Sequence, residues 1–188
     1  MPTKQIIVDS RGRGAHIDVL DHFPIIDVDH HRIHEGHRFT TVDIDHAVAT
    51  AAPKYWLIRP PKRPLIHFMY SINATYSGTI ELFRGPTVTD PGVALLVDNN
   101  NQNMTRTATL LVYRDPTITD DGVRIGGQVL GSDGLAANNK GAEGGSRDRK
   151  NERPLRCGTD YIVKFTSVLN DTRVSFRIEH YEQVGYGV

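Results

Sequence analysis

The stretch RVSFRIEH, residues 173–180, has the clearest strand pattern in the chain, because polar and apolar side chains alternate along it from Arg173 to Glu179. Successive side chains of a β-strand point to opposite faces of the sheet, so an alternating run is typical of a strand with one face on a hydrophobic core. We therefore predict a half-buried strand with Val174, Phe176 and Ile178 facing the core, and with Ser175, Arg177 and Glu179 facing outward.

Apolar runs of similar length recur along the rest of the chain. TIEL (79–82) alternates in the same way, and YIVKF (161–165) places Tyr161, Val163 and Phe165 on one face. Three other runs are apolar on both faces, namely LIHFMYSI (65–72), VALLV (93–97) and TLLVY (109–113). We expect these three to be central strands, or strands that a partner subunit covers a second time.

Clusters of turn-forming residues separate the runs. Asn, Asp and Gly gather at 98–103, 119–122 and 169–172, where they supply the local hydrogen bonds and positive φ angles of tight connections. No segment shows sustained helical periodicity. The spacing of runs and turns predicts an all-β protein of about 8–10 strands.

Composition limits the classes of protein that need to be considered. Hydrophobic residues make up 38% and charged residues 23% of the 188 residues, which fits one globular domain with a single core. Lys+Arg and Asp+Glu balance at 22 each, so charge gives no reason to expect direct binding of nucleic acid or a membrane. No run has the length of a membrane span or a signal-peptide core, so we expect a protein made in a cytoplasm.

Two segments fall outside the strand pattern. Residues 1–28 carry one short apolar run and then RGRG, and we interpret them as an extended N-terminal arm whose Ile6, Ile7, Val8, Arg11 and Arg13 contact a partner. Residues 131–153 are polar and rich in glycine, and we interpret them as one long functional loop. The sandwich domain is then expected to cover residues 29–188.

The stretch DHHRIHEGHRF, residues 29–39, contains His30, His31, His34 and His37. If it is a strand, alternation places His31 and His37 on one face and His30 and His34 on the other, with a bend or bulge at Gly36. We favour polar histidines at a strand entrance. A metal site completed by ligands from a second subunit is the first alternative, and a pH-sensitive interface is the second.

No signature of a catalytic site appears elsewhere. The chain has no P-loop, dinucleotide fingerprint or nucleophile elbow. Cys157 is the single cysteine, so no intramolecular disulfide forms, and we expect a buried or half-buried thiol. His67 and His180 lie in strand patterns and are expected to be hydrogen-bonded polar residues. The sequence therefore predicts a non-enzymatic protein without a cofactor or small-molecule substrate.

The order of the segments, more than any single one, resembles a known family. The segments are IHEGHRFT, YWLIRPPKRPLIHFMYSI, GTIELFRGPTVTDPGV, DNNNQNMTRTATLLVYRDPTIT, the glycine-rich loop, NERPLRCGTDYIVKFTSV and RVSFRIEHYE. Over residues 30–183 this order is similar to that of tailed-bacteriophage virion proteins, the small jelly-roll or β-sandwich proteins that decorate or cement the capsid.

The resemblance implies a jelly-roll-like β-sandwich of about 8–10 antiparallel strands with an extended N-terminal arm. It also implies a structural virion protein on the capsid surface, assembled in the host cytoplasm, that binds the major capsid protein and bridges its subunits. A homo-oligomer, either a dimer or a trimer, is expected.

Two other functions remain open. Related sandwiches occur in phage head fibres and tails, where they bind receptors or carbohydrates, although only 7% of the residues here are aromatic and available for sugar stacking. A cupin-like metalloenzyme built on the histidine cluster is the third hypothesis.

Overall fold

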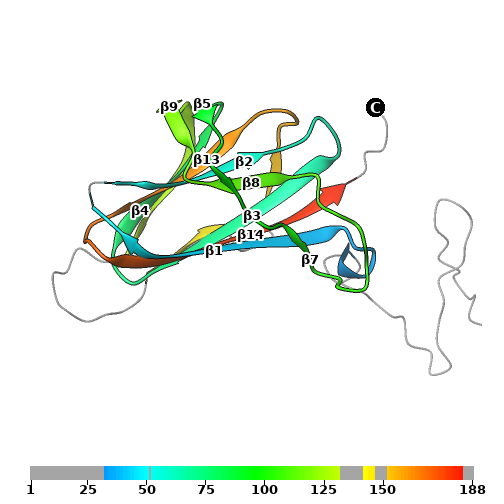
Figure 1. The fold of residues 1–188 in the computed structure, drawn as a ribbon, viewed down its shortest axis with the longest axis horizontal. Coiled ribbons are helices and arrows are strands. Elements are labelled where there is room, and N and C mark those ends of the chain that lie inside the picture. The colour runs from blue at the N-terminus through cyan, green and yellow to red at the C-terminus, as the bar shows by residue number, and fades with distance from the viewer. Residues whose placement is uncertain (1–31, 51, 132–141, 147–151, 184–188) are drawn as a thin grey trace, which may run out of the picture.

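The computed structural model, which describes residues 32–50, 52–131, 142–146 and 152–183, contains two large β-sheets stacked face to face (Figure 1). Paired strands run antiparallel in both sheets. The chain is therefore an all-β antiparallel sandwich, which confirms the predicted fold class. In these described ranges, no helix is long and apolar enough to cross a membrane.

The first sheet has the strand order β11-β3-β14-β1-β7, and β12 also pairs with β3. The alternating stretch 173–180 lies in β14, which has β1 on one side and β3 on the other. The strands of this sheet are β1 (Arg38–Val48), β3 (Leu65–Ala74), β7 (Asp98–Asn99), β11 (Ala142–Ser146), β12 (Arg153–Leu155) and β14 (Thr172–Gln183).

The second sheet has the strand order β10-β4-β13-β2-β8-β6. Its strands are β2 (Lys54–Arg59), β4 (Gly78–Arg84), β6 (Val93–Ala94), β8 (Leu111–Arg114), β10 (Val123–Leu130) and β13 (Tyr161–Ser167). The two remaining strands, β5 (Thr87–Asp90) and β9 (Thr117–Asp120), pair only with each other and form a separate ribbon at one corner of the sandwich (Figure 1).

The main core lies between the two sheets. Trp56 of β2 and Phe176 of β14 come from opposite sheets, are fully buried, and stack with ring centroids 4.2 Å apart. The inward residues of β14 that the alternation predicted, Val174, Phe176 and Ile178, all belong to this core. Trp56 Nε1 donates a 2.8 Å hydrogen bond to Asp43 Oδ2, so the polar atom of the indole has a partner inside the core.

The strand count exceeds the prediction of 8–10, since the structure has fourteen strands among its described residues. Part of the excess comes from very short elements, because β6 and β7 have two residues each. Another part lies in residues 131–153, which are not one long loop. β11 falls within this range and β12 begins at its last residue, Arg153, and both strands pair with β3.

One of the three apolar runs is a central strand and the other two are not; the alternative that a partner subunit covers those two stays a prediction. Residues Phe68–Ile72 of β3 are buried on both faces, as expected for a central strand. In contrast, Val112 of β8 is buried while Leu111 is 48% exposed, and Leu96 near β6 is 80% exposed. These two runs lie at the edge of the second sheet, where one face meets solvent in the single chain.

Candidate functional site

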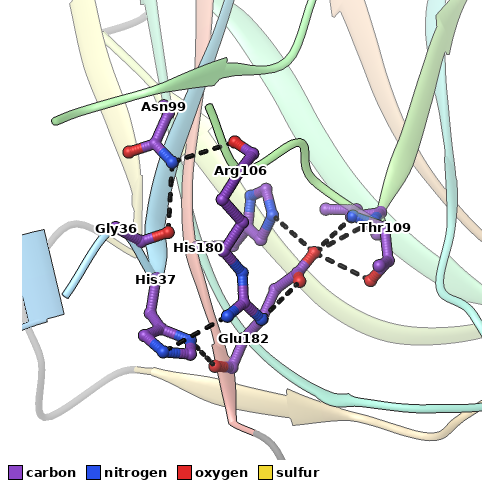
Figure 2. A network of polar contacts seen from close by, with 8 residues as sticks. Gly36, His37, Asn99, Arg106, Thr109, His180 and Glu182 are labelled. Carbon is purple, nitrogen blue, oxygen red and sulfur yellow. Dashed lines mark hydrogen bonds and ion pairs between the residues drawn. The ribbon is translucent and has the colours of Figure 1, made fainter. Parts of the chain in front are cut away.

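β14 continues its inward-facing series past Ile178 with two polar residues, His180 and Glu182. Both side chains are fully buried at one end of the sandwich. They lie beside the segment around His37 and the loop that precedes β8 (Figure 2). A buried carboxylate is costly without hydrogen bonds, so its partners define the first candidate site.

Glu182 is held by donors from residues far away in sequence. Its Oε1 accepts hydrogen bonds from Thr109 N at 2.5 Å, from Thr109 Oγ1 at 2.8 Å and from Leu110 N at 3.3 Å. Arg106 Nη2 lies 3.7 Å from Oε2 and forms an ion pair with it. These contacts fasten the loop before β8 to the end of β14 (Figure 2).

Burial and hydrogen bonding act in opposite directions on the pKa of Glu182. Burial raises the pKa of this carboxyl group, but the His180 ring and the hydrogen bonds from Thr109 favour the ionised form more strongly and hold the pKa at about 2. The carboxylate is therefore charged at neutral pH.

His180 is buried in a different way. Its ring stacks on Phe39 with centroids 5.2 Å apart, and neither ring nitrogen has a hydrogen-bond partner in the described part of the chain. Its Nε2 lies 3.9 Å from Glu182 Oε1, which is beyond hydrogen-bond distance. Burial lowers the pKa of His180, so the ring is neutral near pH 7. The expectation of a hydrogen-bonded histidine is wrong here.

The histidine-rich segment supplies the third side of this cluster. His37 O accepts from Glu182 N at 3.0 Å, and His37 Nδ1 donates to Glu182 O at 3.2 Å. Its Nε2 then accepts from Arg106 Nη1 at 3.3 Å, which assigns the neutral Nδ1–H tautomer. Asn99 Nδ2 donates to both Gly36 O and Arg106 O. His37 therefore joins the strand entrance to the loop and to β14.

The local backbone differs from the strand predicted for this segment. Residues 32–34 form a single helical turn, Gly36 follows with φ +68°, and β1 begins only at Arg38. The predicted bend at Gly36 is confirmed, whereas the argument that strand alternation divides the histidines is wrong for the described part of the segment. Side chains alternate between two faces in a strand but not in a helical turn, so alternation does not set the direction of the side chains in this turn.

The structure brings no metal site together among its described residues, which contain no group of three His, Cys, Asp or Glu side chains placed to hold an ion. His30 and His31 lie outside those residues, as do Ile6, Ile7, Val8, Arg11 and Arg13 and the rest of the 1–28 arm. The hypothesis of a metal shared between subunits therefore stays a prediction. Cys157 is exposed, so the expected buried thiol is wrong.

A second polar cluster lies on the opposite, outer face of the first sheet. His67 Nδ1 contacts Glu152 Oε1, and His67 Nε2 lies 2.9 Å from Gln183 Oε1. Tyr181 stacks on His67 with centroids 4.3 Å apart and donates a 2.7 Å hydrogen bond to Glu152 Oε1. This cluster links the chain entering β12 to β3 and β14, and it confirms that His67 is a hydrogen-bonded residue.

The outer face of the second sheet carries a separate apolar cluster under the β5–β9 ribbon. Leu57, Phe83 and Ile162 are buried there by residues that pack over them, including Val88 and Ile118 of the ribbon. The ribbon therefore has its own small core, outside the space between the sheets. It covers an apolar surface that would otherwise face solvent.

A repeated sequence builds the ribbon. RGPTVTDPGV (84–93) and RDPTITDDGV (114–123) differ at only three positions. In each copy an Asp Oδ1 accepts from the N–H of a glycine two residues later, at 3.0 Å for Asp90 and Gly92 and at 2.9 Å for Asp120 and Gly122. The valine that ends each copy pairs with the arginine that begins the other. The two copies are thus related by an approximate two-fold axis.

Two of the three differences between the copies have a structural reason. Asp115 replaces Gly85, and its carboxylate lies 2.8 Å from Lys54 Nζ. Asp121 replaces Pro91, and its carboxylate lies 2.9 Å from Lys164 Nζ. The second copy therefore carries the ion pairs that bind the ribbon to the sheet.

Replacing Ile118 with alanine is expected to loosen the ribbon. The side chain is half-buried, so the lost contact lowers the free energy of unfolding by about 1–2 kcal/mol, near the lower limit for a buried isoleucine. The rate of amide hydrogen exchange should increase more in β5 and β9 than in β14, compared with the wild-type protein. Val123→Ala is the control, because Val123 is 60% exposed, and it should leave exchange unchanged. Equal effects from both variants would contradict the packing described here.

The fold and its clusters define a class, an antiparallel β-sandwich whose buried polar residues join strands to loops. Searches of protein-family models, curated proteins and solved structures give no match to this chain. No family is therefore assigned by comparison.

Sequence reasoning missed the partners of Glu182 and the repeat. The alternation that begins at Val174 could have been continued to Glu182, which would have placed two polar residues on the core face. The repeat is visible in the sequence at an interval of 30 residues. Thr109 as a partner has no local signal, since 73 residues separate it from Glu182.

Proposed function

We propose that this chain is a structural virion protein that decorates or cements a capsid. The observation that carries the proposal is the order of its long strands. β1, β14, β3 and β11 are neighbours in one sheet, and β2, β13, β4 and β10 are neighbours in the other. The chain passes from sheet to sheet at every connection between these eight strands except that from β4 to β10. This order supports a jelly roll, an architecture used by viral capsid and lectin domains.

The placement of the reactive side chains supports a role without catalysis. His37, His67 and Glu182 each bind residues of another strand or loop, and these contacts hold the fold together. A catalytic group has to reach a substrate, whereas Glu182 is fully buried. The proposed activity is therefore binding.

Exposed apolar side chains on the second sheet support a protein partner. Leu96 is 80% exposed, Val93 is 55% exposed and Leu111 is 48% exposed, all in or near β6 and β8. Surfaces of this kind are typical of protein–protein contacts. We propose that the major capsid protein is this partner and that the chain bridges neighbouring capsid subunits on the particle surface.

Quantification of the chain in purified particles tests this proposal. A decoration protein should be present in a fixed ratio to the major capsid protein and should rebind particles from which it has been removed. Leu96→Glu is expected to weaken rebinding at least tenfold, a loss of about 1.4 kcal/mol. Val129→Glu, at a site that is 65% exposed on β10, is the control.

Absence of the chain from particles would contradict the proposal. A few copies per particle, together with binding to host cells or to a glycan array, would instead support the alternative of a head-fibre or tail receptor-binding module.

A further inference from the structure

Within the described residues, one long edge of the first sheet has no strand beside most of its length. β7 lies beside only one end of β1 (Figure 1), where it pairs with Phe39 and Thr40. Among the described residues, no strand pairs with the same side of β1 from Thr41 to Val48. An unpaired strand edge presents rows of free N–H and C=O groups to any extended chain that approaches it.

The direction of the backbone shows which residues face this edge. Arg38 O accepts from Asn100 N near β7, whereas His37 O accepts from Glu182 N in β14. Backbone groups of successive strand residues point to alternate sides, so those of Val42 and Ile44 point to the open edge. The side chains of the same two residues are 51% and 56% exposed. The edge therefore offers hydrogen bonds and apolar contact area at the same place.

The edge of β10 in the other sheet has contacts with the first sheet. Gln128 Oε1 accepts from Gly145 N at 3.1 Å, and Arg153 Nη1 donates to Ile125 O at 3.2 Å. These contacts occupy one backbone group of β10, Ile125 O, and one of β11, Gly145 N, that could otherwise bind another chain.

The carboxylates of β1 on the inner face already have partners within the chain. Asp43 lies 3.4 Å from Arg114 Nη1, and Asp45 lies 2.7 Å from Lys54 Nζ. The exposed apolar side chains of Val42 and Ile44 are therefore those that a strand at this edge would meet, and an apolar, β-branched strand complements them.

Residues 5–9, QIIVD, have this composition. Residues 9–31 connect them to the described chain and can span about 75 Å when fully extended, which is enough to reach another subunit. The same span also reaches the open part of β1 in the same copy, beyond β7, and the experiment below separates the two cases.

We propose that residues 5–9 of a second copy add as a strand to the open edge of β1, beside Val42 and Ile44. Main-chain hydrogen bonds would supply affinity, and the apolar side chains on the outer face would fix the register. The inference concerns self-association, so it stands or falls independently of capsid binding.

Disulfide trapping with full-length chains tests it. One variant carries Val42→Cys, the other carries cysteine at Ile6, Ile7 or Val8, and all carry Cys157→Ser because Cys157 is exposed. Strand side chains alternate in direction, so cysteines at positions 6 and 8 should react with the cysteine at position 42 at similar rates. The cysteine at position 7 faces the other way and should differ from both in rate. The reactive positions should form mixed disulfides at least tenfold faster than with the control Val129→Cys. Equal rates at all three positions, or rates equal to the control, would overturn the proposal.

Two further results would also overturn it. If the Val42→Cys variant alone formed disulfide-linked dimers faster than it formed the mixed disulfides, β1 would pair with β1. A double variant with cysteine at position 42 and at the reactive position gives the other result. If it formed only intramolecular disulfides, the segment would add to β1 within one copy. Sedimentation provides the second measurement, in which Ile44→Lys and Ile7→Asp should each weaken self-association at least tenfold. Ile17→Asp, a matched change outside the proposed strand, should not.

Discussion

Replacing Glu182 with alanine is expected to lower the free energy of unfolding by about 3–5 kcal/mol, which is the usual effect of removing one partner from a buried charged network. The substitution leaves the N–H groups of Thr109 and Leu110 without their acceptor and removes the ion pair with Arg106. It also takes away the contact that fastens the loop before β8 to β14. Urea unfolding of the variant and of the wild-type protein measures the difference.

Glu81→Ala is the matched control. Glu81 lies in the middle of β4, and its partner Arg124 is 66% exposed, so the ion pair is at the surface. Surface pairs contribute about 0–1 kcal/mol, and we expect a loss within that range. A Glu182→Ala variant no less stable than Glu81→Ala would mean that the buried network does not stabilise the fold.

The same carboxylate predicts how stability depends on pH. The pKa of Glu182 falls from 4.5 to about 2 in the folded chain, so the unfolded chain binds the proton more tightly. Stability from this group is complete above about pH 5 and is lost as the pH falls toward 2. His180 acts in the same direction, since burial lowers its pKa below the ordinary value of 6.5, and protonation of the ring therefore favours the unfolded state. Glu182→Gln should therefore show a shallower loss of stability between pH 5 and pH 2.

Much of the fold follows from local pattern. Period-2 alternation places Val174, Phe176 and Ile178 in the core, and the turn clusters separate the strands, because both signals depend only on neighbouring residues. The glycine-rich β11 has no such signal. Glycine does not favour strands, and β11 forms because it pairs with β3, more than 65 residues away in the sequence.

The candidate site was harder to predict for the same reason. The histidines attract attention because four lie close together in sequence, yet His37 acts through Arg106 and Glu182, which come from other parts of the chain. Residue type alone did not distinguish His67, whose ring is hydrogen-bonded, from His180, whose ring nitrogens have no described partner. The difference arises from which face of the first sheet each ring occupies.

The repeat in the ribbon leads to the second large effect, which is expected for Gly92→Ala and Gly122→Ala. Their φ angles are +82° and +84°, a region that residues with a side chain rarely adopt. A Cβ atom at Gly92 would lie 2.3 Å from Arg114 O, and one at Gly122 would lie 2.6 Å from Arg84 O. Both obstacles are backbone atoms and cannot rotate away. Backbone strain of roughly 1–3 kcal/mol and a similar cost for the forced displacement predict a loss of about 3 kcal/mol for each variant.

The repeat supplies its own control in Gly85→Asp. Gly85 also has a positive φ angle of +70°, but a Cβ atom there would meet nothing within 4 Å. Its counterpart in the second copy is Asp115, which adopts φ +54°. The second copy thus already carries the substitution in an equivalent position, so Gly85→Asp should change stability by less than about 1 kcal/mol.

Combining Gly92→Ala with Gly122→Ala then tests whether the two copies act as one unit. Each substitution separates one valine–arginine pair, Val93 from Arg114 or Val123 from Arg84, and both pairs flank the same ribbon. If one substitution already detaches the ribbon from Leu57, Phe83 and Ile162, the second substitution removes fewer of the remaining stabilising contacts. The double variant should therefore lose clearly less than the sum of the single losses in urea unfolding. Full additivity would mean that each copy is held to the sheet independently, and that the ribbon does not act as one unit.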